Sequence, residues 1–280
     1  MTPIPTRALG ALQVSIVGLG TNNFGMRIDE EKSHRVIDAA LEVGINFFDT
    51  ADLYGPSEEF IGRALEGRRD QVILATKFGK PVEGKGSGAR PEYVMRALEV
   101  SLDRLRTNWV DLYQIHEPDL SVPIGETLAA LDDLVKAGKV KEIGCSNFSV
   151  PQLQEAEAAV AKGGARFVSV QNEYSLMKRE AEADVLPECE RAGLAFLPYF
   201  PLASGLTGDR GTIGDPVGER QAATGADGGS DQEEHGSAGG RAVGRLGILF
   251  GREREGTEST SHQWLRRYRP SETWRVFGHR

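Results

Sequence analysis

Three strand-like stretches in the first half of the chain decide the fold: Ile45-Asn-Phe-Phe-Asp-Thr-Ala51, Val72-Ile-Leu-Ala-Thr-Lys77 and Val110-Asp-Leu-Tyr-Gln-Ile-His116. Each is a short apolar run of the kind that forms a strand buried on both faces of a parallel sheet. Each also ends on polar residues: Asp49, Lys77 and His116 mark successive strand ends, and Tyr54 lies just beyond the first. Four chemically versatile side chains are therefore expected at one edge of a sheet.

The alternation of strand and amphipathic helix extends to about residue 204. Four further strand-like runs cover residues 14–20, 140–146, 167–171 and 194–199, and helices are expected to begin near Asp29, Ser57 and Pro91. Seven such repeats predict an α/β fold of the β/α-barrel type rather than a doubly wound sheet. The absence of Gly-x-Gly-x-x-Gly after the first strand supports this choice. A β/α barrel places its chemistry at the C-terminal ends of its strands.

Bulk properties narrow the function classes. The 280-residue chain has a formal charge of −8, which argues against nonspecific nucleic-acid binding. Cys145 and Cys189 provide neither a disulfide framework nor a metal cluster, so we expect no metal and a reducing compartment. The first ten residues lack the apolar segment of a signal peptide, and no run reaches the roughly 20 apolar residues of a membrane span. We therefore expect a cytoplasmic protein with no membrane partner and leave its oligomeric state open.

The composition changes abruptly after about residue 204. Residues 205–280 hold 16 of the 34 glycines and 11 arginines, but none of the lysines. Their one coherent apolar run is Leu246-Gly-Ile-Leu-Phe250, without an amphipathic period around it. Such a segment buries too little apolar area to offset the entropy of ordering it. We predict a truncated barrel over residues 1–204 and a divergent tail without fixed structure over 205–280.

Three strings resemble the aldo-keto reductase family, in the order and spacing that this family shows: Phe48-Asp-Thr-Ala-Asp-Leu-Tyr-Gly55, Ile143-Gly-Cys-Ser-Asn-Phe148 and Tyr199-Phe-Pro-Leu-Ala-Ser204. The resemblance covers roughly residues 7–206. It implies a (β/α)8 barrel, or TIM barrel, that reduces aldehydes or ketones to alcohols. It also implies NADP(H) as cofactor, with NAD(H) as the alternative, and a small-molecule carbonyl compound as substrate.

The chain departs from the family beyond the third string. Family members continue with a helix, an eighth strand and an eighth helix, and the loop after that strand grips the 2′-phosphate of NADP. The sequence offers no counterpart, so we expect an incomplete barrel of seven strands. We interpret the Gly- and Arg-rich composition as a shifted reading frame that starts near residues 205–209. A native low-complexity tail is the alternative.

The resemblance assigns roles to individual residues. Tyr54 would protonate the carbonyl oxygen, although a free tyrosine has a pKa of about 10 and donates poorly near neutrality. The Lys77 ammonium would stabilise the resulting anion, Asp49 would orient the lysine, and His116 would hydrogen-bond the carbonyl. Contacts to the cofactor are expected from Gly20, Thr21, Ser146, Asn147, Gln171, Tyr199, Pro201, Leu202 and Ser204.

Each of these residues, taken alone, has an ordinary structural interpretation. Asp49 could cap a helix, Tyr54 could be a packed aromatic, Lys77 a solvated strand end and His116 a loop histidine. Two other functions also remain open: a catalytically silent, cofactor-binding regulatory subunit of the same fold, and an inactive truncated product. The complete set of four at successive strand ends favours the enzyme.

Overall fold

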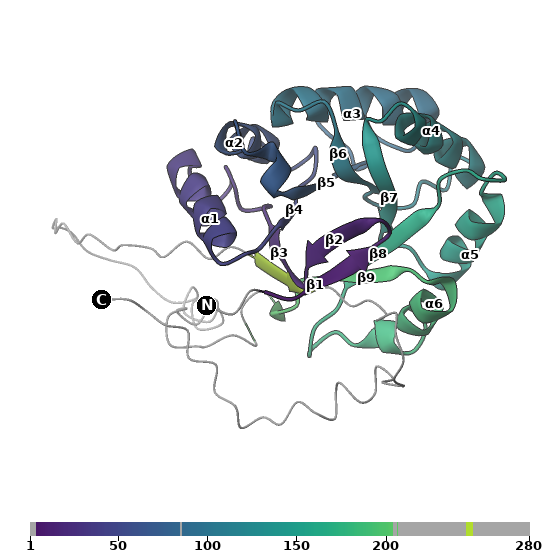
Figure 1. The fold of residues 1–280 in the computed structure, drawn as a ribbon. Coiled ribbons are helices and arrows are strands. Elements are labelled where there is room, and N and C mark those ends of the chain that lie inside the picture. Colours follow the sequence, from purple (N-terminus) through teal and green to yellow (C-terminus); the bar gives the residue numbers. More distant parts are fainter. Residues whose placement is uncertain (1–3, 85, 204–205, 207–244, 249–280) are drawn as a thin grey trace, which may run out of the picture.

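The computed structural model describes residues 4–84, 86–203, 206 and 245–248 (Figure 1). Its centre is a set of seven strands: β3 (Val17–Gly20), β4 (Phe47–Asp49), β5 (Ile73–Phe78), β6 (Val110–Ile115), β7 (Val140–Ser146), β8 (Phe167–Glu173) and β9 (Ala195–Tyr199). They pair in chain order, each parallel to its neighbour. The prediction of seven parallel strands is confirmed, and they form a curled half-barrel.

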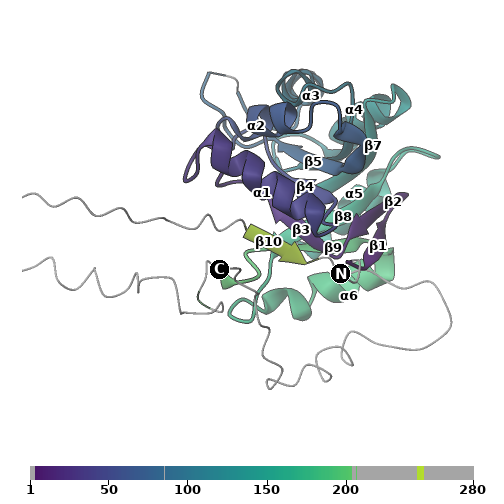
Figure 2. The same ribbon diagram turned by 60° about the vertical axis from the view of Figure 1, so that its left-hand side comes forward.

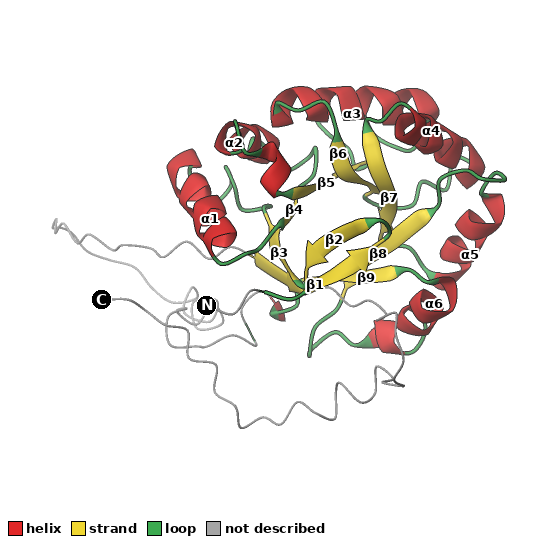
Figure 3. Cartoon of the chain, viewed as in Figure 1, coloured by secondary structure: helices red, strands yellow, loops and turns green. Residues whose placement is uncertain are grey.

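Helices follow one another around the outside of the strands (Figure 3). They are α1 (Glu30–Glu42), α2 (Ser57–Ala64), α3 (Pro91–Leu105), α4 (Ile124–Lys136), α5 (Val150–Ala159) and α6 (Val185–Ala192), with short 3-10 turns η1 (Arg69–Gln71) and η2 (Glu180–Glu182). The Asp29 carboxylate caps α1 by accepting from the Lys32 N–H, and Pro91 occupies the first turn of α3. In the described part of the chain, no helix is both long and apolar enough to cross a bilayer.

An antiparallel hairpin, β1 (Thr6–Leu9) and β2 (Leu12–Ser15), precedes the first barrel strand. The prediction of a single strand over residues 14–20 is therefore wrong in its first half, because Val14 and Ser15 belong to the hairpin and the first barrel strand begins at Val17. Gly10 makes the turn at φ +59°, where a side chain would collide with Glu142 and Val168. The hairpin places Leu9, Leu12 and Val14 in one core with Phe47, Ala75, Leu112, Ala195 and Leu197. It closes the end of the barrel at which the strands begin.

An eighth strand joins the sheet from the tail. β10 (Arg245–Ile248) pairs antiparallel with β3, from Arg245 opposite Gly20 to Ile248 opposite Val17 (Figure 2). The expectation of an unstructured tail differs from the structure at these four residues, because the edge of β3 offers unpaired backbone groups that a strand can satisfy. A parallel eighth strand is not among the described residues. The other residues of the predicted tail, except Leu206, lie outside the described residues. The interpretation as a shifted reading frame concerns the same part of the chain and lies outside them as well.

Candidate active site

The four predicted catalytic residues meet at the ends of β4, β5 and β6. Asp49 is the last residue of β4, Lys77 lies near the end of β5, His116 follows β6, and Tyr54 lies in the turn that leads into α2. Lys77 Nζ is 2.5 Å from Asp49 Oδ2 and 5.5 Å from the centroid of the Tyr54 ring. The Tyr54 and His116 rings meet edge to face, with centroids 5.8 Å apart. The structure thus gathers all four into one cluster.

Lys77 is charged in spite of its burial. Its side chain is only 1% exposed, and burial by itself lowers the pKa of an ammonium group. The negative charge of Asp49 and the interactions with Tyr54 outweigh this penalty and raise the pKa of Lys77 above its usual value. The Thr50 carbonyl accepts a further hydrogen bond from Nζ at 3.0 Å. A protonated lysine next to a tyrosine ring is therefore a built-in feature of this site.

Asp49 is held by two amides as well as by the lysine. Its Oδ1 accepts from Gln114 Nε2 at 3.0 Å and from Gln171 Nε2 at 3.3 Å. The sequence pattern did not single out Gln114, although it lies on β6, two positions before His116. Residues two apart on a strand share a face, so the spacing could have assigned Gln114 to the interior. The side chain of Gln171, predicted as a cofactor contact, also helps to orient Asp49.

His116 is uncharged over the physiological range. Burial, followed by the positive charges of Lys77 and Lys80, lowers its pKa to about 3. Its Nδ1 is buried and has no hydrogen-bond partner among the described residues. A neutral imidazole has one N–H donor and one acceptor nitrogen, so His116 can donate a hydrogen bond to an oxygen without carrying a charge.

A second group of polar side chains lies beside the first. The Ser146 hydroxyl donates to the Gln171 carbonyl at 2.7 Å, and Asn147 Nδ2 donates to the His116 carbonyl at 2.9 Å. The Tyr199 hydroxyl donates to Asn147 Oδ1 at 2.9 Å. Asn147 has φ +62°, a left-handed conformation that asparagine tolerates better than most residues. Four of the predicted cofactor contacts therefore form one connected network.

The remaining predicted contacts are less closely connected. Thr21 follows Gly20 at the end of β3, is fully buried, and donates from both its N–H and its hydroxyl to the Asp49 carbonyl at 3.0 Å. It supports the backbone of Asp49, and its contact with a cofactor stays a prediction. Leu202, one residue after Pro201 beyond β9, is exposed. Ser204 lies outside the described residues.

The donor set of the second group suits a nicotinamide cofactor. A carboxamide needs an acceptor for its NH₂ and a donor for its carbonyl, and hydroxyl and amide side chains supply both. Ser146, Asn147 and Gln171 are of these types, and the half-buried Tyr199 ring adds an aromatic face. No group of three or more His, Cys, Asp or Glu side chains able to hold a metal occurs in the part of the chain that the structure describes.

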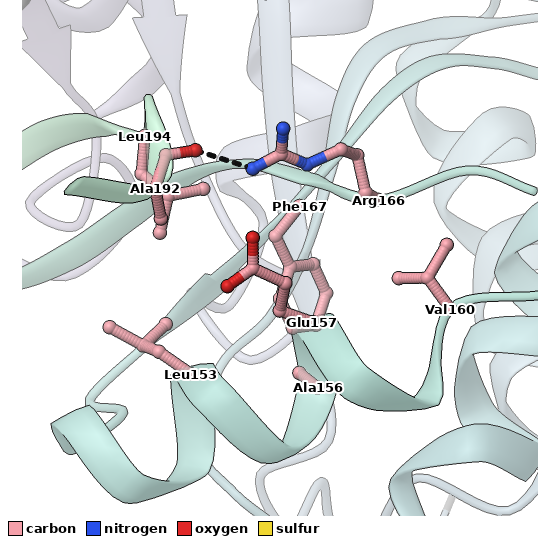
Figure 4. A pocket seen from close by; sticks show the side chains of 8 residues that line it. All are labelled: Leu153, Ala156, Glu157, Val160, Arg166, Phe167, Ala192 and Leu194. Carbon is pink, nitrogen blue, oxygen red and sulfur yellow. Dashed lines mark hydrogen bonds between the residues drawn. The ribbon is translucent and has the colours of Figure 1, made fainter. Parts of the chain in front are cut away.

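A small hollow between α5, α6 and the start of β8 is unrelated to this site (Figure 4). Its lining is Leu153, Ala156, Glu157, Val160, Arg166, Phe167, Ala192 and Leu194. Both charged side chains in its lining are already paired: Arg166 Nη2 donates to the Ala192 carbonyl at 2.6 Å, and Glu157 Oε2 accepts from Arg191 Nη2 at 2.5 Å. The hollow contains none of the predicted site residues and lies near the strand starts. Cys145 and Cys189 are both buried, and neither is part of a disulfide.

Comparison with known proteins identifies the family of this chain. The model of the "Aldo/keto reductase family" matches residues 16–243, beyond the last recognisable string. The chain is 41% identical over 217 residues to "Uncharacterized oxidoreductase YrpG" of Bacillus subtilis (71% of this chain, 66% of the relative). It is 40% identical over 207 residues to "Aldo-keto reductase YhdN" of the same organism (70% and 60%). The matched part of the chain thus spans about two thirds or less of these relatives.

A solved structure shows the same fold. The aldo-keto reductase AKR11C1 from Bacillus halodurans, in its holo form, superimposes with a TM-score of 0.65 at 35% identity, covering 72% of this chain and 68% of that one. The curled half-barrel of seven parallel strands and its outer helices match the (β/α)8 fold of this family, without a parallel eighth strand among the described residues. The family match covers well over half of the sequence. The chain belongs to the aldo/keto reductase family.

Proposed function

We propose that this protein reduces the carbonyl group of an aldehyde or ketone to an alcohol, with a reduced nicotinamide cofactor as the second substrate. The observation that supports this most directly is the Asp49–Lys77–Tyr54–His116 cluster at the strand ends. A phenol, a buried cation and a neutral imidazole in one place suit protonation of an oxygen that gains negative charge. The complete arrangement favours an enzyme over a catalytically silent subunit.

Each residue has a distinct part in the reaction. The Tyr54 hydroxyl gives its proton to the carbonyl oxygen, so an O–H bond forms as the C=O π bond opens. The Lys77 ammonium stabilises the phenolate that remains, and Asp49 keeps the ammonium charged and in place. Neutral His116 donates a hydrogen bond to the same oxygen and orients the carbonyl. Solvent then returns a proton to Tyr54.

The network of Ser146, Asn147, Gln171 and Tyr199 would hold the nicotinamide end of the cofactor. A bound NADPH or NADH would supply the hydride that forms the new C–H bond. The Ser146 hydroxyl and the two amides would fix the carboxamide, and the Tyr199 ring would cover one face. Holding both reactants in a fixed orientation is a large part of what such a site contributes.

The test is turnover by the full chain, compared with the variant Tyr54→Phe. Purified protein is mixed with 4-nitrobenzaldehyde and either NADPH or NADH, and loss of the reduced cofactor is followed by absorbance. We expect turnover with at least one cofactor, and a decrease in kcat of roughly 10²- to 10⁴-fold in Tyr54→Phe. Cofactor affinity, measured by calorimetry, should stay nearly constant, because the hydroxyl acts on the reacting oxygen.

Tyr113→Phe is the matched control. Tyr113 is a buried tyrosine whose hydroxyl donates to the Val94 carbonyl, on the helix side of β6. The Tyr113→Phe variant also loses a phenolic hydroxyl, but away from the cluster, and should keep the wild-type kcat. Cofactor binding without turnover in the wild-type protein would favour the regulatory-subunit alternative. Turnover in Tyr54→Phe equal to that of the wild type would exclude Tyr54 as the acid.

A further inference from the structure

A fully buried carboxylate lies four residues after Tyr54 and has no part in the proposed reaction. Glu58, in the first turn of α2, is 0% exposed. Its Oε1 accepts from the Thr76 hydroxyl at 2.7 Å, and its Oε2 accepts from Arg104 Nη1 at 3.1 Å. A buried charge is costly unless it is paired and hydrogen-bonded. Glu58 meets both conditions, which raises the question of what it holds together.

Arg104 connects Glu58 to the backbone that leads to Tyr54. The same Nη1 that contacts Glu58 is 3.1 Å from the carbonyl oxygen of Asp52. Arg104 comes from the last turn of α3 and its side chain is 13% exposed. Its approach depends on Gly62, where a Cβ atom would lie 2.4 Å from the Arg104 carbonyl oxygen. The close packing of α2 on the end of α3 therefore sets the position of this guanidinium.

The turn that carries Tyr54 is fixed at both of its ends. The Asp52 N–H donates to the Lys77 carbonyl at 3.0 Å, and the Tyr54 N–H donates to the Ala51 carbonyl at 3.1 Å. On the far side, the Ser57 N–H donates to the Tyr54 carbonyl at 3.1 Å. Arg104 thus hydrogen-bonds the Asp52 carbonyl at the start of this turn and pairs with Glu58, which directly follows the turn in α2.

Glu58 also contacts the strand that carries the lysine. Thr76 directly precedes Lys77 on β5, and adjacent residues on a strand face opposite sides. The Thr76 hydroxyl therefore reaches out to Glu58 while Lys77 points into the barrel toward Asp49. One buried ion pair joins the backbone segments of both Tyr54 and Lys77.

We propose that Glu58 and Arg104 are positioning residues that hold the turn of Tyr54 in register with Lys77. This inference rests on the proposed function and adds two residues to its machinery that touch neither reactant. A displacement of about 1 Å in a reacting group can lower a rate by roughly 10²-fold. Loosening the ion pair should therefore lower kcat while leaving the cofactor site, on the other strands, intact.

The central experiment compares Glu58→Gln with Glu59→Gln. The two residues are neighbours in α2 and lose the same charge, but Glu59 is exposed and serves as the matched control. We expect kcat per cofactor-binding site, with 4-nitrobenzaldehyde as substrate, to fall by roughly 10- to 100-fold in Glu58→Gln. Glu59→Gln should stay within about twofold of the wild type, because surface substitutions rarely have large effects. The cofactor Kd should change little in either variant.

Hydrogen exchange provides a readout that does not depend on turnover. We expect faster amide exchange over residues 50–57 in Glu58→Gln and unchanged exchange in α4, which lies away from the ion pair. If Glu58 only stabilised the fold as a whole, amide exchange in Glu58→Gln would become faster in α4 as well as over residues 50–57. If the wild-type protein shows no turnover, the proposed function is contradicted, and the exchange data alone then decide whether this ion pair holds the turn.

Milder variants keep the inference testable if Glu58→Gln does not fold. Thr76→Val removes a single hydrogen bond to Glu58 with almost no change in shape, and Arg104→Lys keeps the charge. We expect an intermediate loss of kcat in Thr76→Val, and a smaller loss in Arg104→Lys than in Arg104→Met. Unchanged exchange over residues 50–57 in Thr76→Val and Arg104→Met, or wild-type kcat in both, would overturn the inference.

Discussion

The two ends of the barrel are built from the same strands and are both buried, yet they contain opposite kinds of residue. On β6 the inward-facing positions change from Leu112 to Gln114, and His116 follows directly after the strand. On β5 they change in the same way from Ala75 to Lys77. Leu112 and Ala75 pack against the N-terminal hairpin, whereas the polar residues face the opposite end. The change from apolar to polar occurs within two residues on each strand.

This difference separates the source of stability from the source of reactivity. Apolar burial contributes about 25 cal/mol per Å², so the hairpin end stabilises the fold. At the other end, Lys77 is buried and Asp49 is partly buried, and the cost of removing these charges from water is offset by their ion pair and by the amides around Asp49. Active sites commonly trade stability for function in this manner. Substitutions at the two ends should therefore have separable effects.

The largest expected effect is on turnover at the polar end. The double variant Asp49→Asn/Lys77→Met replaces a buried ion pair by neutral side chains of similar size. We expect kcat to fall by at least about 10³-fold, because Tyr54 loses the cation that stabilises its anion. We also expect the free energy of unfolding to be unchanged or higher, since neutral replacement of a buried pair is often stabilising.

Urea unfolding and initial rates on the same preparations test this prediction. The single variant Lys77→Met is the informative comparison, because it leaves the Asp49 carboxylate without its cation and should unfold at lower urea than the double variant. A double variant that is several kcal/mol less stable than the wild type would contradict the separation of the two ends.

The apolar end should show the opposite behaviour. Leu9 is fully buried beneath the strands, so Leu9→Ala leaves a cavity and should lower the free energy of unfolding by about 3 kcal/mol. The kcat of the folded fraction should stay close to that of the wild type. Leu120→Ala is the control, since Leu120 is 87% exposed in the loop after β6 and should leave stability nearly unchanged. A large fall in kcat for Leu9→Ala would show that the hairpin also shapes the site.

The sequence was most informative where a polar residue ended an apolar run. Asp49, Lys77 and His116 were recognisable in this way, and the structure brings them together with Tyr54. Gln114 was harder to find because it lies inside the run, and only the two-residue period of the strand reveals its side. The sequence pattern did not separate the end of the hairpin from β3, since Val14 and Ser15 are as strand-like as the residues that follow. Pairing partners of a strand are long-range properties, so the antiparallel contact of β10 with β3 could not be predicted locally.

Next in size is a pH effect at Asp52, beside the ion pair of Glu58 and Arg104. Burial, followed by the negative charge of Glu58, raises the pKa of the Asp52 carboxyl to about 7. An unfolded chain loses this proton near pH 4, so between about pH 4 and 7 the folded state binds a proton that the unfolded state has lost. Ionisation of Asp52 therefore lowers wild-type stability as pH rises, and the full cost is present above about pH 7.

Asp52→Asn removes this cost because an amide does not ionise. We expect the stability advantage of the variant over the wild type to increase from pH 5 to pH 8, by on the order of 2 kcal/mol. Urea unfolding at the two pH values measures the gain. Asp70→Asn, at an exposed position in η1, is the control and should gain less. A constant difference between Asp52→Asn and the wild type would show that Asp52 does not titrate in this range.

The smallest expected effect returns to the hairpin. Glu142 Oε1 accepts a hydrogen bond from the Ala11 N–H at 2.6 Å, at the exposed tip where the hairpin meets β7. Glu142→Gln keeps the acceptor oxygen but removes the charge, so the bond should weaken, lowering the free energy of unfolding by about 0.5 kcal/mol. Because this contact lies at the stabilising end, kcat should be unaffected. A change in kcat larger than the change in stability would mean that the hairpin transmits its position to Asp49 and Lys77, and that the two ends of the barrel are coupled.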